Sequence, residues 1–446
     1  MVIVGGGFGG LYAAKKLRRR GVLITLIDKR NFHLFQPLLY QVATGELSAG
    51  DIASPLRAIF KNDENIRVIN SEVIDIEPRE QKVFLRNSEI DYDILIVASG
   101  VEQNYYGKES QWRAAAPSLK TVEDALEIRG RILSAFENAE KENNPEIKKS
   151  WLTFLIIGGG PTGVEMAGAL VELAFQTLQK EFRTFNAEDI RIILVEKGER
   201  ILTAFSLELS QKAEQELKRR GVEIRKNTSL SAVEDGVVCL ESAGELSQIA
   251  SRTLIWAAGI KGAGMSEILR MRTAGKLDHN GRVMVNPDLS LPGYRNIFVI
   301  GDLANFSYQD GHPLPAIAPV AVQQGKYVAG LIQKKLSDRT APPFRYRDKG
   351  ILAVIGRNAA IANFGRLKLS GFFAWLLWIF VHIAYLIEFD NKFIVLFQWA
   401  WNYFTHRRHS RLIIGKFACL SETCGDVSQP SNIRKVKTVF QSDSSI

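Results

Sequence analysis

The residues best suited to chemistry lie in a glycine-rich motif at the start of the chain. An apolar run at residues 2–4 leads into Gly5, Gly7 and Gly10, and a helix is expected over residues 11–20. A second apolar strand at residues 22–27 ends at Asp28, 23 residues after Gly5. Strand, glycine turn, helix, strand and acid in this order form the dinucleotide-binding βαβ unit, where the acid follows after ~20 residues. A glycine turn alone would be weak evidence, but the complete order favours a bound dinucleotide.

Each glycine of this motif has its own physical role. Gly5 allows the tight turn, Gly7 lets the backbone approach a pyrophosphate, and Gly10 lets helix and strand pack closely. The amino end of the helix then directs its partial positive charge at the phosphates. Asp28 can accept hydrogen bonds from a ribose.

The same pattern recurs 153 residues further along the chain. Residues 152–157 lead into a second glycine motif, a helix is expected from Val164, and a strand at residues 191–195 ends at Glu196. The corresponding glycines are Gly158, Gly160 and Gly163. Two such units in one chain predict two dinucleotides, one that stays bound and one that exchanges.

Three further apolar strands, at residues 92–100, 253–259 and 296–302, end in or beside glycine. Ligands in open α/β sheets lie beyond the carboxyl ends of the strands, so Gly100 and Gly259 predict close approach of the backbone to a cofactor. Asp302 could accept a hydrogen bond from a ribityl hydroxyl or from water. A helix is expected from Pro319 to residue 335, and it carries Gln324.

Composition limits the remaining possibilities. A length of 446 residues suggests about three domains, and 46% hydrophobic with 24% charged residues is typical of a globular protein. Three cysteines are too few for a disulfide framework, and Met1 stands directly before the first strand, so we expect no targeting segment and a cytosolic-side location.

The carboxyl-terminal segment predicts association with a membrane. Residues 371–387 and 393–404 are apolar and rich in tryptophan, and arginines follow at once. Seventeen helical residues reach ~26 Å, short of the ~30 Å hydrocarbon core, so neither stretch spans comfortably. Helices lying in the interface, with arginines on anionic headgroups, fit better than a buried subunit interface. No stacking aromatics interleave with the basic tail, so nucleic acid is not expected. Residues 413–446 are polar and expected to be disordered.

The chain resembles the type II NADH dehydrogenases, which are single-polypeptide NADH:quinone oxidoreductases. The resemblance rests on residues 31–45 (NFHLFQPLLYQVATG), the second glycine motif with Val164-Glu165, residues 321–330 (AVQQGKYVAG) and the membrane segment. It implies an α/β fold of two Rossmann-like domains plus a membrane-associating helical segment. The implied divisions are residues 1–120 and 275–344 for FAD, 121–274 for NADH, 345–412 for membrane anchoring, and 413–446 for the tail.

The resemblance also implies roles for single residues. Gly5, Gly7, Gly10 and Asp28 would hold the FAD pyrophosphate and adenosine ribose, and Gly100 and Asp302 would follow the ribityl chain. Gly158, Gly160, Gly163 and Glu196 would do the same work for NADH. Glu165 and Gln324 match positions near nicotinamide, flavin and quinone, and Lys368 is a weaker match to a lysine beside the quinone.

The predicted reaction transfers hydride from NADH to FAD and then two electrons to a membrane quinone, without proton pumping. Glu165, expected in the first turn of its helix, could hold the nicotinamide amide or relay a proton, or it could simply complement the helix dipole. Gln324, expected beside the flavin ring edge, could donate to a quinone carbonyl or be an ordinary helix residue. His406 and His409 lack partners at metal spacing, so no metal is expected.

The sequence argues against two alternative functions and leaves three others open. A disulfide reductase would need two cysteines soon after Asp28, and a sulfide:quinone oxidoreductase would need cysteines in both main domains; neither set occurs. A specialised naphthoquinone acceptor, an NADPH donor, or a non-catalytic NADH-binding flavoprotein is compatible with the sequence. We expect a homodimer that lies as a peripheral protein on the cytoplasmic face of an energy-transducing membrane, with residues 371–411 on anionic lipid.

Overall fold

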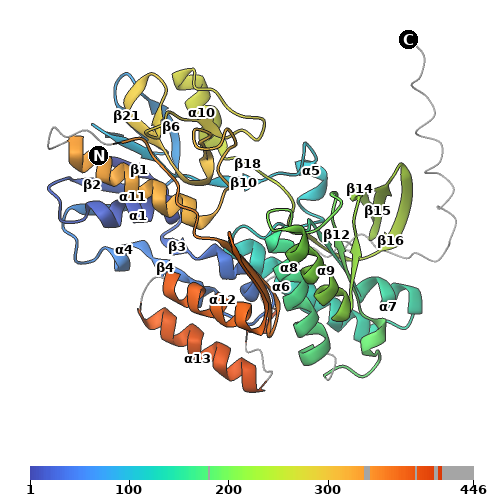
Figure 1. Cartoon of the computed structure of the whole chain (residues 1–446). Helices are drawn as coiled ribbons and strands as arrows, with labels where there is room; N and C mark the ends of the chain where they lie inside the picture. The colour runs from blue at the N-terminus through green and yellow to red at the C-terminus, as the bar shows by residue number, and fades with distance from the viewer. Residues whose placement is uncertain (179–180, 336–341, 387–388, 406–409, 414–446) are drawn as a thin grey trace, which may run out of the picture.

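The computed structural model describes residues 1–178, 181–335, 342–386, 389–405 and 410–413. His406, His409 and nearly all of the tail predicted to be disordered lie outside the described residues. Two α/β lobes stand side by side, and a pair of carboxyl-terminal helices lies along one edge of the molecule (Figure 1).

The first lobe is built on a six-stranded sheet in the order β20-β21-β9-β1-β2-β5. Four of its strands come from the first hundred residues and two from near residue 290: β1 (Val2–Val4), β2 (Ile24–Asp28), β5 (Ile66–Asn70), β9 (Leu95–Val97), β20 (Ser290–Leu291) and β21 (Tyr294–Val299). All neighbours are parallel except β20 and β21. The central register sets Ile3 opposite Leu26 and Ile96, and all three side chains are buried. Continuous apolar strands are typical of a parallel sheet that is covered on both faces.

The second lobe repeats this design with a four-stranded parallel sheet in the order β13-β12-β11-β17. Its strands are β11 (Thr153–Ile157), β12 (Arg191–Val195), β13 (Val222–Arg225) and β17 (Thr253–Trp256). Helices α6 (Val122–Lys141), α8 (Pro161–Val171) and α9 (Leu207–Arg219) belong to this lobe, and three strands between residues 228 and 250 form a separate antiparallel sheet.

Both helices that follow the glycine motifs begin three residues earlier than predicted. Helix α1 spans Phe8–Leu17 rather than residues 11–20, and α8 begins at Pro161 rather than at Val164. Gly7 and Gly160 are the residues that precede the first helical positions. The prediction was wrong because glycine is a poor helix former in general, whereas here the third glycine is needed inside the first turn for packing.

Glycines also bring α1 close to α11 (Ala318–Lys335), the helix predicted from Pro319. A β-carbon at Gly325 would collide with the carbonyl oxygen of Gly9. Helix α11 therefore packs directly against α1, although the two helices are about three hundred residues apart in the chain.

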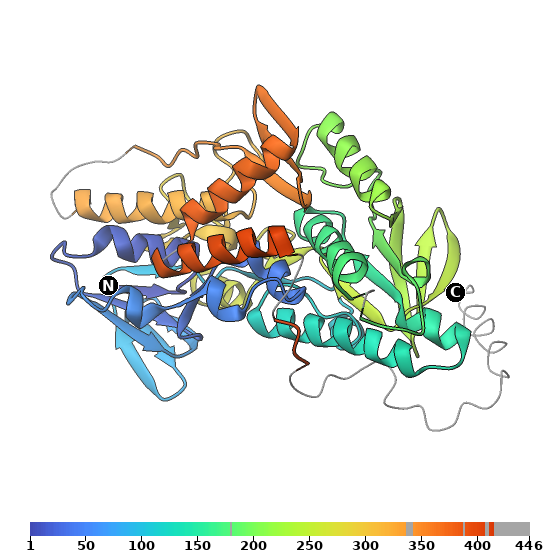
Figure 2. The same ribbon diagram turned by 90° about the horizontal axis from the view of Figure 1, so that it is seen from below.

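The carboxyl-terminal part consists of a three-stranded antiparallel sheet and two helices. The sheet contains β23 (Ile351–Gly356), β24 (Ala359–Phe364) and β25 (Leu367–Gly371), and β23 packs on α8 of the second lobe. Helices α12 (Phe372–Tyr385) and α13 (Phe389–Thr405) follow and lie beside each other in both views (Figure 2). None of the helices in the described part of the chain is both long enough and apolar enough to cross a membrane.

Candidate functional site

One cavity of about 1760 Å³ connects the three parts of the molecule. Its wall includes the first glycine turn at residues 5–9, the start of α8 with Pro161 and Glu165, and the carboxyl ends of the sheet strands with Gly100, Gly259 and Asp302. The far end of the cavity reaches α12 at Val381, His382 and Tyr385. A molecule in this cavity can therefore contact the first glycine turn, the start of α8 that follows the second glycine turn, and α12.

The first glycine turn has the geometry that a phosphate site needs. Gly5 has φ +104°, and a β-carbon there would meet the carbonyl of Ala98, so no other residue fits. A β-carbon at Gly10 would collide with the carbonyl oxygen of Gly5, which shows how closely α1 packs on the strand. Space around Gly7 is open, so a ligand can approach its backbone. These contacts fit a pyrophosphate at the amino end of α1.

The second glycine turn reproduces this geometry position by position. Gly158 has φ +114° and lies against the backbone of Ala257, Gly163 packs on the carbonyl of Gly158, and the space around Gly160 is open. Pro161 at the first helical position matches the preference for proline where no backbone donor is needed.

The acids that end the second strands hold their own glycine turns. One Asp28 oxygen accepts from the Gly6 amide at 2.6 Å and the other accepts from the Arg30 amide at 2.7 Å. Glu196 accepts in the same manner from the amides of Gly159 and Gly198, both at 2.6 Å. Since a carboxylate has about four acceptor positions, each acid retains capacity for a ribose hydroxyl.

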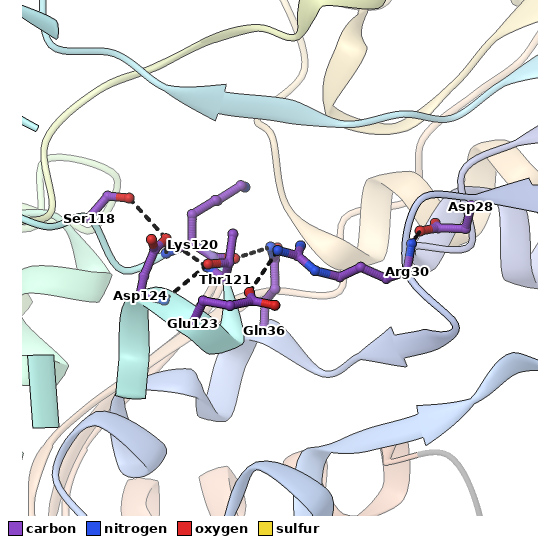
Figure 3. Close-up of polar contacts among 8 residues, drawn as sticks. All are labelled: Asp28, Arg30, Gln36, Ser118, Lys120, Thr121, Glu123 and Asp124. Atoms are coloured by element: carbon purple, nitrogen blue, oxygen red, sulfur yellow. Dashed lines mark hydrogen bonds and ion pairs between the residues drawn. The ribbon is translucent and has the colours of Figure 1, made fainter. Parts of the chain in front are cut away.

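A polar network closes over the Asp28 end of the cavity and ties the first lobe to the start of α6 (Figure 3). The Arg30 guanidinium donates to Glu123 at 2.7 Å, and the Gln36 amide donates to the backbone oxygen of Lys120 at 3.0 Å. Thr121 caps α6, and its hydroxyl accepts from the Asp124 amide. The chain crosses from the first lobe into the second at this cap, so the network fixes the relative position of the lobes beside the cavity.

Asp302 lies three residues beyond β21, in a short 3-10 turn at Gly301–Leu303, whereas the sequence analysis placed it as the last residue of the strand. Burial raises the pKa of its carboxyl above the ordinary value, and the ammonium of Lys120, 3.9 Å away, acts in the opposite direction. Gly100 and Gly259 lie on the same cavity wall, with φ +74° and +72°. The structure therefore brings together the three strand-end residues that the sequence analysis selected. Lys120 was missed, because nothing in its local sequence indicates that it faces an acid 182 positions away.

Glu165 faces the cavity from the second turn of α8. The prediction that it lies in the first turn was wrong, since α8 begins at Pro161 and has no acid in its first turn. The alternative interpretation, that Glu165 only complements the helix dipole, is therefore less favoured, because that effect fades beyond the first turn. Its carboxyl oxygen accepts a long hydrogen bond, 3.4 Å, from the Val354 amide, and burial raises its pKa to about 8. With this pKa, the carboxyl group of Glu165 is mainly protonated at pH 7.

Gln324 lies within the protein rather than on the cavity wall. Its side chain is 1% exposed, and its Oε1 accepts from the Gly301 amide at 2.6 Å. Its Nε2 is buried without a hydrogen-bond partner among the described residues. Lys368, on β25, forms an ion pair with Glu208 at 3.7 Å, and it does not line the cavity either. The geometry thus separates Glu165, which faces the cavity, from both of these residues.

His382 is a cavity residue that the sequence analysis missed. Its Nδ1 lies 2.8 Å from the carbonyl oxygen of Trp378, so this nitrogen carries the proton and Nε2 is an acceptor. Burial lowers its pKa to about 4, which keeps the ring neutral. The ring lies against Trp378, with the two ring planes tilted by 31°, and it meets Phe35 edge-on. Its spacing of three residues from Tyr385 on the same helix was the only signal for it. Among the described residues, no cluster of acids, histidines or cysteines could hold a metal ion.

Helices α12 and α13 expose a continuous set of large apolar side chains, called the apolar face below. On α13 the opposite side is buried, with Val395 and Trp399 in the protein core. Figure 2 views the molecule from the side on which both helices lie. The apolar face consists of Phe372, Phe373, Leu376, Phe380, Phe393, Ile394, Leu396, Phe397 and Trp401, each at least 43% exposed.

Comparisons with known proteins agree with this geometry. Residues 1–325 match the family model described as pyridine nucleotide-disulphide oxidoreductase, and residues 349–408 match the one described as NDH2 C-terminal domain. A type II NADH:quinone oxidoreductase of Mycobacterium tuberculosis is 42% identical over 92% of this chain and 89% of its own length. A mitochondrial external NADH-ubiquinone oxidoreductase of Saccharomyces cerevisiae is 29% identical over 92% and 82%. The structure of NDH2 from Plasmodium falciparum in complex with NADH superposes with a TM-score of 0.82 at 20% identity, covering 93% of this chain and 99% of that one.

Proposed function

Because the chain belongs to the type II NADH:quinone oxidoreductase family, we propose that it binds FAD in the first lobe and NADH in the second and reduces a membrane quinone at the α12 end of the shared cavity, without proton pumping. The enzyme is an NADH:quinone oxidoreductase, and the cavity that joins the first glycine turn and the start of α8 to α12 is the observation that carries this placement. FAD, when bound, accepts hydride from NADH and returns two electrons to the acceptor.

The residues of the first lobe fit FAD. The open backbone at Gly7 and the amino end of α1 would hold the pyrophosphate, Asp28 the adenosine ribose, and Gly100 with Asp302 the ribityl chain. The amino end of α11, with Pro319 on the cavity wall, directs its partial positive charge towards the ring position.

The second lobe fits NADH in the same way. Gly158, Gly160 and Gly163 would form the pyrophosphate turn, and Glu196 would accept from the ribose hydroxyls. The guanidinium of Arg200 donates to the carbonyl oxygens of Phe205 and Thr203, so it is engaged away from this acid. This engagement favours NADH over NADPH, whose 2′-phosphate would meet Glu196.

Glu165 is proposed to supply a proton to the reduced quinone. Its raised pKa keeps the carboxyl protonated at neutral pH, and it lines the same cavity as α12. A protonated carboxyl can donate to a quinone oxygen, which a carboxylate cannot. Gln324, which holds the amide of Gly301 beside Asp302, is proposed to act near the flavin through this contact.

The apolar face is proposed to lie on a lipid surface. Exposed aromatic and aliphatic side chains on two short helices are typical of interfacial binding. Attachment to anionic lipid, the cytoplasmic face and a homodimer stay predictions; vesicle flotation, protease accessibility in sealed vesicles and sedimentation test them in turn.

The first test is turnover by the purified holoenzyme. The protein should be yellow, bind about one FAD and oxidise NADH at the expense of a short-chain quinone. A folded, FAD-loaded preparation that is reduced by NADH but never reoxidised by quinone would contradict the proposal and favour a binding flavoprotein.

A further inference from the structure

A chain of buried hydrogen bonds runs from α13 to the cavity wall. The indole Nε1 of Trp399 donates to the side-chain oxygen of Gln41 at 2.8 Å, and the Gln41 amide donates to the hydroxyl of Tyr40 at 3.2 Å. Trp399, Gln41 and Tyr40 are 8%, 4% and 4% exposed. Buried polar bonds of this kind are costly to break, because the group left behind cannot turn to water.

The two ends of this hydrogen-bond chain, Trp399 and Tyr40, lie in different environments. Trp399 lies on the inner side of α13, while Phe397 and Trp401, two positions on either side, belong to the apolar face. Tyr40 lies on α2 (Leu39–Ala43) and lines the cavity. The chain therefore connects the helix proposed to lie on lipid with a wall of the site proposed to reduce quinone.

Tyr40 also lines the cavity together with Glu165, and its helix α2 contacts α8. Burial raises its pKa above the ordinary range, and the next largest cause is the nearby negative charge of Glu165 when that group is ionised. Because its oxygen accepts from Gln41, the Tyr40 hydroxyl can direct its own proton elsewhere.

A second contact fixes the same elements to each other. Asn402, on the next turn of α13, donates to the backbone oxygen of Glu46 at 3.4 Å, and the Ser410 amide donates to the carbonyl of Gly45 at 3.3 Å. These two hydrogen bonds join the loop after α2 to α13 and to Ser410, so they add to the connection between α2 and α13.

We propose that the Trp399–Gln41–Tyr40 chain makes Trp399 and Gln41 positioning residues for quinone reduction: the seating of α13 on lipid sets the position of Tyr40 on the cavity wall. The proposal rests on the proposed function, since it assumes that quinone is reduced in this cavity. It predicts an effect on the quinone half of the reaction and none on the NADH half.

The decisive variant is Trp399→Phe, with Trp378→Phe as the matched control. The ring centroids of Trp378 and Trp399 are 5.2 Å apart and both residues are buried, 2% and 8% exposed, but Nε1 of Trp378 has no hydrogen-bond partner among the described residues. Both substitutions remove one indole, and only the first removes a hydrogen bond. On vesicles of anionic phospholipid, W399F should slow flavin reoxidation by a short-chain quinone about fivefold to tenfold, the scale of one buried hydrogen bond. Flavin reduction by NADH should stay within about twofold of wild type in both variants.

A double variant separates positioning from general loosening of α13. Tyr40→Phe removes one oxygen atom from the far end of the chain, so it should slow reoxidation to the same extent as W399F. The pair W399F/Y40F should be no slower than Y40F alone, because both changes break one chain. Y40F also keeps the test open if W399F does not fold, and FAD content and vesicle flotation verify that each variant is intact.

Each outcome has one meaning. Equal rates for W399F and W378F, additive effects of W399F and Y40F, or equal slowing of both half reactions would overturn the positioning role. A wild-type enzyme that NADH reduces and quinone does not reoxidise would instead refute the proposed function.

Discussion

Replacement of Glu165 by glutamine tests whether a protonated carboxyl serves the quinone step. Glutamine keeps the size of the side chain and a hydrogen-bond donor, but it cannot release a proton. In the native protein burial raises the pKa of Glu165 to about 8 from an ordinary 4.5, so the group is mainly protonated at pH 7. We expect E165Q to lose proton donation and to keep the shape of the cavity.

The magnitude follows from this pKa. With a pKa of about 8, the protonated fraction falls from about nine-tenths at pH 7 to about one-tenth at pH 9. A reoxidation step that needs this proton should therefore slow about tenfold over that interval. General acid catalysis contributes at least about a hundredfold, so E165Q should be slower by about that factor at pH 7, with a flat pH profile.

Stopped-flow absorbance of the flavin measures the two halves separately. The enzyme is first reduced with one equivalent of NADH and is then mixed with a short-chain quinone between about pH 6 and pH 9.5, a range that brackets the folded pKa. A pH-independent wild-type rate, or a wild-type rate in E165Q, would refute the role of acid. Slower flavin reduction with normal reoxidation would assign Glu165 to the nicotinamide instead.

Thermal unfolding checks the same pKa without catalysis. A carboxyl whose folded pKa is raised binds its proton more tightly when folded, so its contribution is complete below pH 4.5 and is lost as pH rises to about 8. The loss is at most about 5 kcal/mol, at 1.36 kcal/mol for each pKa unit, and smaller where water enters the cavity. E165Q should therefore gain Tm relative to wild type as pH rises from about 6 to about 9.

Three other substitutions probe the remaining assignments. Glu196→Gln should raise the NADPH to NADH ratio of kcat/KM about tenfold, because it removes the charge that repels a 2′-phosphate; an unchanged ratio would show that Glu196 does not set the preference. Changing four phenylalanines of the apolar face (F373S, F380S, F393S and F397S) should release the enzyme from vesicles, since each buried phenylalanine contributes about 1.5–3 kcal/mol; continued flotation would refute interfacial binding. Gln324→Leu should lower the free energy of unfolding by about 1–3 kcal/mol and weaken FAD retention, because the Gly301 amide loses its acceptor. Q324E keeps an acceptor oxygen and should retain FAD. Equal behaviour of the two variants would show that this hydrogen bond is unimportant.

The order of strands, glycine turns and acids could be predicted because each obeys a local rule. Buried parallel strands read as apolar runs, and a turn with positive φ selects glycine, as at Gly5 and Gly158. The starts of α1 and α8 were each predicted three residues too late, because the third glycine of each motif, placed before the predicted helix, lies within its first turn.

The contacts that join distant segments could not be predicted from one sequence. Trp399 and Gln41 are 358 positions apart, and no spacing rule relates them. The side of α11 that carries Gln324 depends on how that helix crosses α1, so its burial against Gly301 appears only in three dimensions. The neutral state of Glu165 has the same origin, since burial rather than neighbouring sequence raises its pKa.

The split origin of the first sheet has a consequence for the order in which the chain folds. Strands β1, β2, β5 and β9 leave the ribosome early, but β21, which pairs with β9, and α11, which covers α1, come after residue 293. The second sheet needs only residues 153–256 and can close while synthesis continues. The lobe that begins the polypeptide is therefore the one completed last, and until then the edge of β9 is an unpaired apolar strand. A nascent chain arrested after the second sheet is complete and before β21 is made should depend on chaperones. The mature enzyme should refold slowly, because its first lobe needs long-range pairing.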